Sequence, residues 1–242
     1  MCMLWIYNNS KCRSDEYSLI LANVRDENLN RPTKTAHFWS SDMQILGGMD
    51  MKEGLEGGTW FAMSTSGKVG VLLNVLQPFD YSDLDKKPRG FLVPNFLKSN
   101  SNGPTYLQSI ASFASIYQPF KLVTLDISGS PNRTLVSQLC NSPEVDFHVY
   151  HNAEIFCFGN NIPNKPWLKM IESEQRYKSI AEKYKQVSKR NALIRQIFGM
   201  LNNKTYYYPD PYLLEQAKGY DTEFIRRLSS VFVHVPMLDF GT

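Results

Sequence analysis

The residue with the clearest chemical potential is Cys2, the second residue of the chain. If Met1 is removed, Cys2 carries a thiol and a free α-amine on one carbon, and an α-amine with a pKa of about 8 can act as a general base near neutral pH. Residues 3–7 form a short apolar run that predicts a strand, which would hold both groups at one end of a sheet. Cys2 is therefore a candidate nucleophile, and a small buried apolar residue is the alternative interpretation.

Further polar side chains lie where predicted strands end. Arg25, Asp26 and Glu27 follow closely on one predicted strand, and Asn74 and Asn160 each lie at the end of a later one. Charged side chains at a strand end can bind a polar substrate, and side-chain amides can donate hydrogen bonds to an oxyanion. Loop ion pairs, turns and helix caps explain the same residues equally well. The residues by themselves leave both interpretations open.

The histidines and cysteines do not form a metal-binding pattern. His148 and His151 are three residues apart in a predicted strand, so their side chains point to opposite faces. The chain has 4 cysteines, and none belongs to a Cys-x-x-Cys pair. We predict no metal site, although a single His, Cys or Tyr could still serve as the axial ligand of a haem.

The composition is that of an ordinary soluble globular protein. Hydrophobic residues make up 43% of the 242 residues, charged residues make up 20%, and the net charge is +3. This balance argues against a nucleic-acid-binding domain, which would be strongly basic. The N-terminus lacks the basic segment of a secretory signal, and the uncharged residues 99–120 contain too many Ser, Gln and Pro for a membrane span. We expect a protein of the reducing cytoplasm.

Hydrophobic spacing predicts a single α+β domain over residues 1–242. Strands are expected at residues 3–7, 17–22, 59–65, 68–75, 121–127, 134–140, 145–150, 154–158 and 229–235, and helical segments at 88–97, 105–118 and 167–201. The strand at 17–22 is apolar almost throughout, so both of its faces should be covered. The segment 167–201 has one apolar face and a basic face that includes Lys169, which predicts either a solvated surface or contact with a membrane surface.

Several short motifs along the chain occur together in a known family. They are Met1-Cys2, Leu19-Ile20-Leu21-Ala22, Arg25-Asp26-Glu27, Arg31-Pro32, Gly48-Met49-Asp50, Glu56-Gly57-Gly58-Thr59-Trp60, Asn74, Gln77-Pro78, Arg89-Gly90, Asn160, Pro166-Trp167 and Pro209-Asp210-Pro211. In order and spacing, above all over roughly the first 100 residues, the chain resembles the transport and Golgi organization 2 family, whose hallmark is an Asn-Arg-Asp-Glu motif.

The resemblance implies an αββα four-layer sandwich like that of N-terminal nucleophile hydrolases, with Cys2 at the nucleophile position. It implies that Arg25 and Asp26 lie beside Cys2 and that Asn74 and Asn160 face an oxyanion, all as candidate catalytic residues. The family is also implicated in intracellular haem trafficking, Golgi organisation, secretion and lipid homeostasis. Haem would then be cargo that passes to haem-accepting proteins, with Arg25 as the partner of a propionate and without a catalytic metal.

Departures from the family pattern bear on the activity. Val24 stands where the hallmark has Asn, Gly159 stands where the family has Ser, and the sequence ends at Thr242 where the family continues into further strands. Catalytic groups must be held within about 0.5 Å, so such losses weaken a catalytic centre more than an apolar binding cleft.

We therefore expect a protein that traffics haem or another anionic apolar molecule. The alternatives are a Cys2-dependent amidase or thioester hydrolase and a non-enzymatic scaffold of the secretory pathway. We expect association with mitochondria, the Golgi or lysosome-related organelles.

Overall fold

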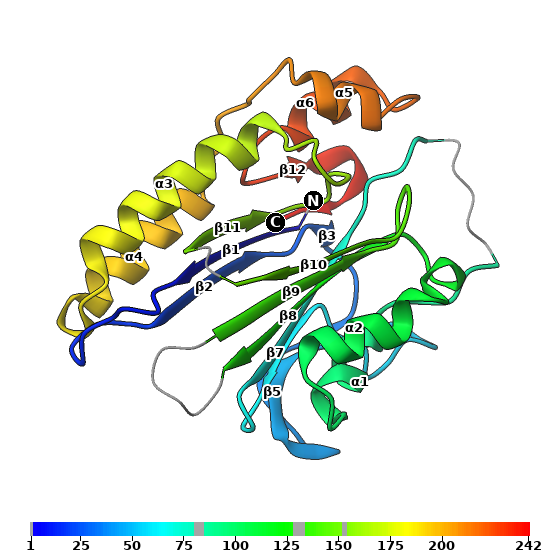
Figure 1. Ribbon diagram of the computed structural model, residues 1–242. Coiled ribbons are helices and arrows are strands. Elements are labelled where there is room, and N and C mark those ends of the chain that lie inside the picture. Colours follow the sequence, from blue (N-terminus) through cyan, green and yellow to red (C-terminus); the bar gives the residue numbers. More distant parts are fainter. Residues whose placement is uncertain (1, 80–84, 128–133, 152–153) are drawn as a thin grey trace. The chain divides into compact units, whose positions relative to one another are not determined.

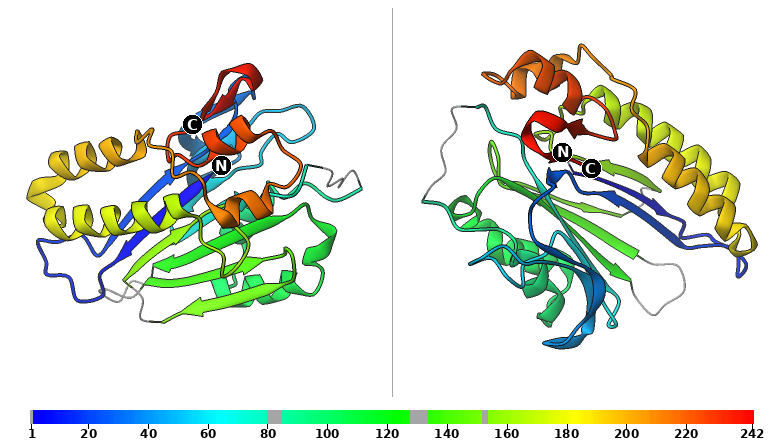
Figure 2. Two further views of the ribbon diagram at one scale, coloured as in Figure 1. Left: turned by 90° about the horizontal axis from the view of Figure 1, so that it is seen from above. Right: turned by 180° about the vertical axis from the view of Figure 1, so that it is seen from behind.

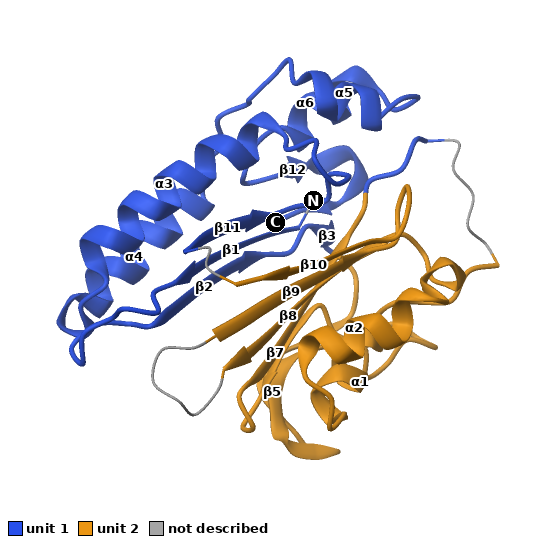
Figure 3. Cartoon of the chain, viewed as in Figure 1, with its two compact units in different colours: residues 1–29, 76–81, 152–242 blue, residues 30–75, 82–151 orange. Residues whose placement is uncertain are grey.

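The computed structural model describes residues 2–79, 85–127, 134–151 and 154–242. The chain divides into two compact units, each made of sheet and helices (Figure 3). Unit 1 comprises residues 1–29, 76–81 and 152–242, and unit 2 comprises residues 30–75 and 82–151. The chain therefore begins in unit 1, passes briefly through it again between the two segments of unit 2, and ends in it. The single-domain interpretation stays a prediction.

Unit 1 is built on a three-stranded antiparallel sheet with the strand order β11-β1-β2 (Figure 1). The strands are β1 (Met3–Asn8), β2 (Leu19–Val24) and β11 (Ile155–Phe158). The helices are α3 (Leu168–Tyr184), α4 (Arg190–Leu201), α5 (Pro211–Gln216) and α6 (Thr222–Leu228). A small second sheet has the order β12-β13-β3 and consists of β12 (His234–Val235), β13 (Phe240–Gly241) and β3 (Glu27–Asn28).

The helix α3 packs on the sheet of unit 1 through the alternate side chains of β1. Met3, Trp5 and Tyr7 are buried in one cluster with side chains of α3. The indole of Trp5 donates to Ser173 Oγ (3.1 Å), and the hydroxyl of Tyr177 donates to the backbone oxygen of Ile20 (2.8 Å). These buried hydrogen bonds are directional, so they determine where α3 lies on the sheet, whereas the apolar contacts only bury it.

Unit 2 is a seven-stranded antiparallel sheet with the order β10-β9-β8-β7-β6-β5-β4. The strands are β4 (Thr33–Trp39), β5 (Asp42–Asp50), β6 (Phe61–Ser64), β7 (Lys68–Asn74), β8 (Phe120–Ile127), β9 (Thr134–Cys140) and β10 (Asp146–Tyr150). The helices α1 (Leu92–Lys98) and α2 (Gly103–Ala111) cover one face. The core between them contains Phe96, Leu107, Phe120, Leu122 and Leu139.

Most of the predicted strands are confirmed. The strands predicted at 59–65 and 68–75 form the β6–β7 hairpin, and Gly67 in its turn has a φ of 86°, which glycine adopts without steric cost. The strand β2 was expected to be covered on both faces, but its side chains alternate between buried and half-buried along the strand. The hairpin of β4 and β5 was missed, because its residues lack a clear apolar alternation.

The segment 167–201 is not one continuous helical stretch. It forms two helices, α3 and α4, which lie side by side as a hairpin (Figure 2). Gln186 between them is extended, with φ −69° and ψ 136°. Tyr17 donates its backbone N–H to Lys185 (2.8 Å), and Val187 donates to Asp15 (2.9 Å). The segment that connects β1 and β2 therefore forms hydrogen bonds with backbone groups of residues 185 and 187. In one continuous helix these groups would bond to other residues of the helix.

The last predicted strand, at residues 229–235, is mostly wrong. Only His234–Val235 is strand, whereas Ser229 and Ser230 follow the end of α6. Their hydroxyl groups donate to the backbone oxygens of Arg226 (2.6 Å) and Arg227 (3.0 Å), which lack partners within the helix at its C-terminal end. The apolar spacing did not predict this helix. Within the described residues, no helix combines the length and the apolar character that crossing a bilayer requires.

Candidate functional site

The antiparallel pairing of β1 and β2 determines the surroundings of Cys2. Met3 at the start of β1 pairs with Val24 at the end of β2, so Cys2 comes beside the residues that follow β2. The Cys2 thiol donates to the backbone oxygen of Asp26, with an S–O distance of 3.9 Å. Cys2 is buried, with 6% of its surface exposed. Burial raises the pKa of the Cys2 thiol, and the nearby carboxylate of Asp26 adds to the increase.

Asp26 is also buried, and its carboxylate faces the C-terminal residues of the chain. The hydroxyl of Thr242 donates to Asp26 Oδ1 and accepts the backbone N–H of Val233 (2.9 Å). The pairing of Gly241 in β13 with Glu27 in β3 holds Thr242 beside Asp26. Asp26 therefore links the end of β2 to the small second sheet.

Lys169 also belongs to this cluster, although the pattern of segment 167–201 predicted an exposed position. It was assigned to the exposed basic face, but it is completely buried. Its ammonium group donates to the backbone oxygens of Leu228 (2.7 Å) and Ser230 (2.9 Å) and lies 5.7 Å from the centre of the Trp167 ring. Apolar spacing gives no signal for this burial, because Lys169 and the polar Ser173 are buried on α3 whereas the apolar Leu168 is exposed.

The environment of Lys169 is electrostatically unusual. Burial lowers its pKa to about 8, since the charged form loses hydration. The negative charges of Asp26 and then of Cys157 and Cys2, when ionised, oppose this effect. Lys169 therefore interacts electrostatically with Asp26, and with Cys2 once the thiol ionises, although its direct hydrogen bonds go to backbone oxygens.

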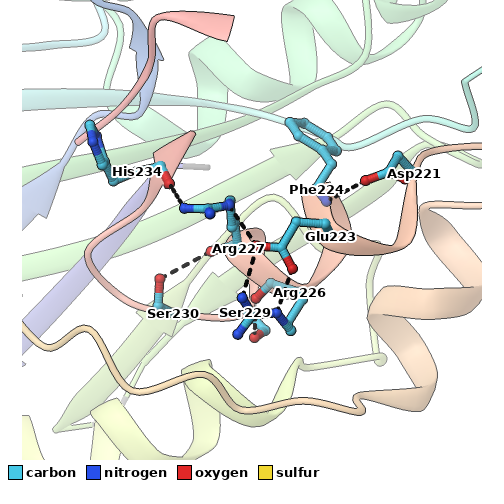
Figure 4. Close-up of polar contacts among 8 residues, drawn as sticks. All are labelled: Asp221, Glu223, Phe224, Arg226, Arg227, Ser229, Ser230 and His234. Atoms are coloured by element: carbon cyan, nitrogen blue, oxygen red, sulfur yellow. Dashed lines mark hydrogen bonds and ion pairs between the residues drawn. The ribbon is translucent and has the colours of Figure 1, made fainter. Parts of the chain in front are cut away.

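The segment that offers these oxygens is itself held at the end of α6 (Figure 4). Arg227 donates from Nη1 to the backbone oxygen of His234 (3.0 Å), which lies seven residues further along the chain. Glu223 pairs with Arg226 (2.7 Å) and with Arg227 (2.8 Å). The hydrogen bond from Arg227 to His234 spans the turn between α6 and β12, and Glu223 holds the Arg227 side chain, so the acceptors of Lys169 have a defined position.

Arg25 and Glu27 do not accompany Asp26 into the buried cluster. They form an ion pair with each other, with 3.6 Å between Arg25 Nη2 and Glu27 Oε2. Their side chains are 19% and 28% exposed. Cys2 and Asp26 are thus neighbours, and Arg25 is a partly exposed cation next to them.

The two candidate oxyanion residues lie in different units. Asn160 belongs to unit 1 and is buried just after β11, where its backbone oxygen accepts from Leu76 N (2.9 Å) and Gln216 Nε2 (2.9 Å). Asn74 belongs to unit 2, where it ends β7 opposite Phe120. The placement of Asn74 beside Cys2 stays a prediction.

Gly159, noted above as a departure from the family pattern, lies where α3 meets β11. A Cβ atom at this position would be 2.8 Å from the sulfur of Met170. A side chain at this position would require the flexible Met170 side chain to shift, an adjustment that glycine makes unnecessary. Among the residues that the structure describes, no group of three or more His, Cys, Asp or Glu side chains could hold a metal ion.

Comparison with known proteins identifies the family. All residues from 1 to 242 match the family described as Transport and Golgi organisation 2. The chain belongs to this family. The Mus musculus Transport and Golgi organization 2 homolog is 32% identical over 234 residues, covering 96% of this chain and 83% of the relative. The Homo sapiens homolog is 31% identical over 237 residues, with 98% and 84% covered. The Drosophila melanogaster Transport and Golgi organization protein 2 is 29% identical over 248 residues, with 100% and 85% covered.

The fold is similar to that of an N-terminal nucleophile hydrolase. A solved structure of a Caenorhabditis elegans orthologue of N-acylethanolamine-hydrolyzing acid amidase matches 81% of this chain and 85% of its own, with a TM-score of 0.50 and 10% sequence identity. At this identity the likeness concerns the fold alone. It confirms the expected α+β class, to which the large antiparallel sheet of unit 2 and the helix-covered sheet of unit 1 both contribute.

Proposed function

We propose that this member of the Transport and Golgi organisation 2 family acts as a carrier, and that its first candidate cargo is haem. It would take haem, or another anionic apolar molecule, from storage or synthesis sites and deliver it to haem-accepting proteins. The observation that carries this proposal is the condition of Cys2. A buried thiol with a raised pKa stays protonated near neutral pH, and the thiolate rather than the thiol is the nucleophile. The centre therefore favours binding over catalysis.

Arg25 is the residue that we assign to a haem propionate. Its guanidinium group is 3.6 Å from Glu27, which is longer than the roughly 2.8 Å of a strong charge-assisted hydrogen bond. A propionate that offers both oxygens to the guanidinium fork makes a stronger pair, so it could take the place of Glu27. Partial exposure of Arg25 supports this exchange, because the side chain is within reach of a ligand.

Titration of the purified protein with haem tests the proposal. We expect a saturable change of the Soret band at micromolar haem, and an affinity lower by about tenfold in Arg25→Gln, since a charged hydrogen bond contributes roughly 1.5 kcal/mol. Arg176→Gln is the matched control, because Arg176 is an exposed arginine on α3 of the same unit. Absence of a saturable change would remove direct haem binding, and an equal loss in both variants would remove the role of Arg25.

A Cys2-dependent amidase or thioester hydrolase is the second candidate. The observation in its favour is that Cys2, Asp26 and the titratable Lys169 interact within unit 1. The Cys2 sulfur would attack the carbonyl carbon of the substrate, and the thiol proton would finally leave with the amine or thiol product. Water would then hydrolyse the acyl group from sulfur and regenerate the thiol.

Intact mass spectrometry distinguishes this candidate from a carrier. An acyl thioester substrate should leave an acyl group on the wild-type protein and on Cys12→Ala, but not on Cys2→Ala. Turnover that persists in Cys2→Ala would contradict the mechanism. A stable protein partner without any small-molecule ligand would instead favour a scaffold of the secretory pathway. For the carrier, we propose action in the cytoplasm beside the Golgi, mitochondria or lysosome-related organelles, with effects on secretion and lipid homeostasis.

A further inference from the structure

The helix α4 and the turn that precedes it expose large apolar side chains. Ile194 and Phe198 of α4 are 46% and 59% exposed, and Val187, just before α4, is 49% exposed. Ile194 and Phe198 are four residues apart, so they lie on one face of the helix. Leu193 and Met200 are buried and supply the contact of α4 with the rest of unit 1. The exposed side chains are thus additional to those that hold α4 in place.

The same part of the chain is strongly basic. Residues 183–209 contain no Asp or Glu, but they contain Lys183, Lys185, Lys189, Arg190, Arg195 and Lys204. Of these, Lys189, Arg190 and Arg195 are exposed and flank the apolar side chains of α4 along the chain. Across the described part of the chain, neither Arg190 nor Arg195 forms an ion pair with a carboxylate. Their charges therefore remain available to an external anion.

The combination of exposed apolar and basic side chains is typical of a helix that lies in a membrane surface. The apolar side chains enter the boundary between headgroups and acyl chains, and the basic side chains contact anionic headgroups. A stable protein–protein interface usually buries about 800 Å² on each partner around an apolar centre. Three separated apolar side chains among unpaired basic groups match a lipid surface better than such an interface.

We propose that the surface formed by Val187, Lys189, Arg190, Ile194, Arg195 and Phe198, the α4 surface, binds peripherally to membranes that contain anionic lipids. The helix lies parallel to the bilayer plane and does not cross it. This binding is separate from ligand binding at Cys2 and Arg25, since none of the six residues belongs to that cluster. It would hold the protein at an organelle surface whether or not the carrier proposal is correct.

Vesicle co-sedimentation of the full chain tests this inference directly. Vesicles of phosphatidylcholine alone are compared with vesicles that contain about one third phosphatidylserine. Each Lys or Arg near an anionic surface contributes roughly 1 kcal/mol, which is about fivefold in affinity, so Lys189→Gln/Arg190→Gln/Arg195→Gln should bind about a hundredfold more weakly. The matched control is Lys34→Gln/Lys52→Gln/Lys98→Gln, which removes three exposed charges from unit 2.

The expected result is binding to the anionic vesicles only, its loss in the α4 triple variant, and its retention in the control. Equal losses in the two triple variants would show a nonspecific charge effect and overturn the assignment to α4. Failure of the wild-type protein to bind anionic vesicles at low salt would also overturn it. If the protein then bound native membranes but not these vesicles, the partner would be a protein.

The apolar side chains give a second, independent readout. Ile194→Gln/Phe198→Gln keeps the charge and the helix propensity of α4 but removes two exposed apolar groups. Binding should fall by at least tenfold and become more sensitive to salt, because only the screened electrostatic contribution remains. Unchanged binding would show that the apolar side chains do not enter the bilayer and would contradict the proposed orientation.

Discussion

Replacement of Lys169 by Met should change the pH dependence of stability in a defined direction. Met has a similar length and no charge, so Lys169→Met removes the buried ammonium and its bonds to the oxygens of Leu228 and Ser230. The pKa of Lys169 is about 8 in the folded protein, against an ordinary value of 10.5. Between these two values, the unfolded chain binds more protons at this residue than the folded chain does. The contribution of Lys169 to stability therefore rises as pH increases.

The magnitude follows from the two pKa values. Their difference corresponds to a penalty of roughly 3 kcal/mol in total, which is present in full below about pH 8 and absent above about pH 10.5. From about pH 7.5 to about pH 9.5 the penalty falls by roughly 2 kcal/mol. The free energy of unfolding of the wild-type protein should therefore gain about 2 kcal/mol relative to Lys169→Met over this interval. At the lower pH the difference between the proteins is small, since the penalty offsets much of the gain from the two hydrogen bonds.

Denaturant unfolding of both proteins at the two pH values measures this difference. Tyrosines and other titrating groups that do not interact with Lys169 affect both proteins alike and cancel. Lys52→Met is the control, because Lys52 is exposed, and its difference from the wild type should not change with pH. A difference between wild type and Lys169→Met that stays constant from pH 7.5 to 9.5 would refute the reasoning. Should the variant not fold, NMR titration of the Lys169 side chain should show a midpoint near pH 8 instead.

Three further predictions concern other contacts. Thr242→Val should lower the free energy of unfolding by about 1–3 kcal/mol, because Asp26 loses a buried donor, and Thr242→Ser should restore most of it in denaturant unfolding. A double-mutant cycle with Arg31→Ala and Asp50→Ala should give a coupling energy of about 1–2 kcal/mol for their paired contacts (3.1 and 2.6 Å), and a value near zero would contradict a stabilising pair. The Cys2 thiol should react with iodoacetamide only after unfolding, as followed by peptide mass spectrometry, and rapid labelling in the native protein would contradict its burial.

The fold was predictable wherever local pattern and tertiary structure agree. The strands β8 to β10 are compact apolar runs between turn residues, and their boundaries in the structure lie within one residue of the predicted ones. The break between α3 and α4 was not predictable from spacing. It depends on the pairing of Gln186 with Glu16, which lies far away in the sequence. Propensity describes what a segment prefers by itself, whereas backbone hydrogen bonds from another segment can override it.

The candidate site, too, was predictable from the sequence only in part. Cys2 and Asp26 were both identified from their places at the ends of two strands, and antiparallel pairing brings them together as expected. Arg25 and Glu27 were identified with them; they are half-buried and form an ion pair, and the charge of Arg25 also acts on the Cys2 thiol. Lys169 was assigned to the wrong face, since its hydrogen-bond acceptors lie 59 and 61 residues further along the chain.

The sequence by itself determined the membership of the family, the α+β class and most of the strands, and the family resemblance implied that Asp26 lies beside Cys2. These depend on residue order, apolar periodicity and local pairing, which are properties of short segments. The tertiary structure decided which of the charged residues are buried, how Lys169 and Thr242 join the cluster, and that the thiol of Cys2 is held protonated. Burial and pKa values depend on the sum of contacts from distant segments, and those contacts exist only once the chain has folded.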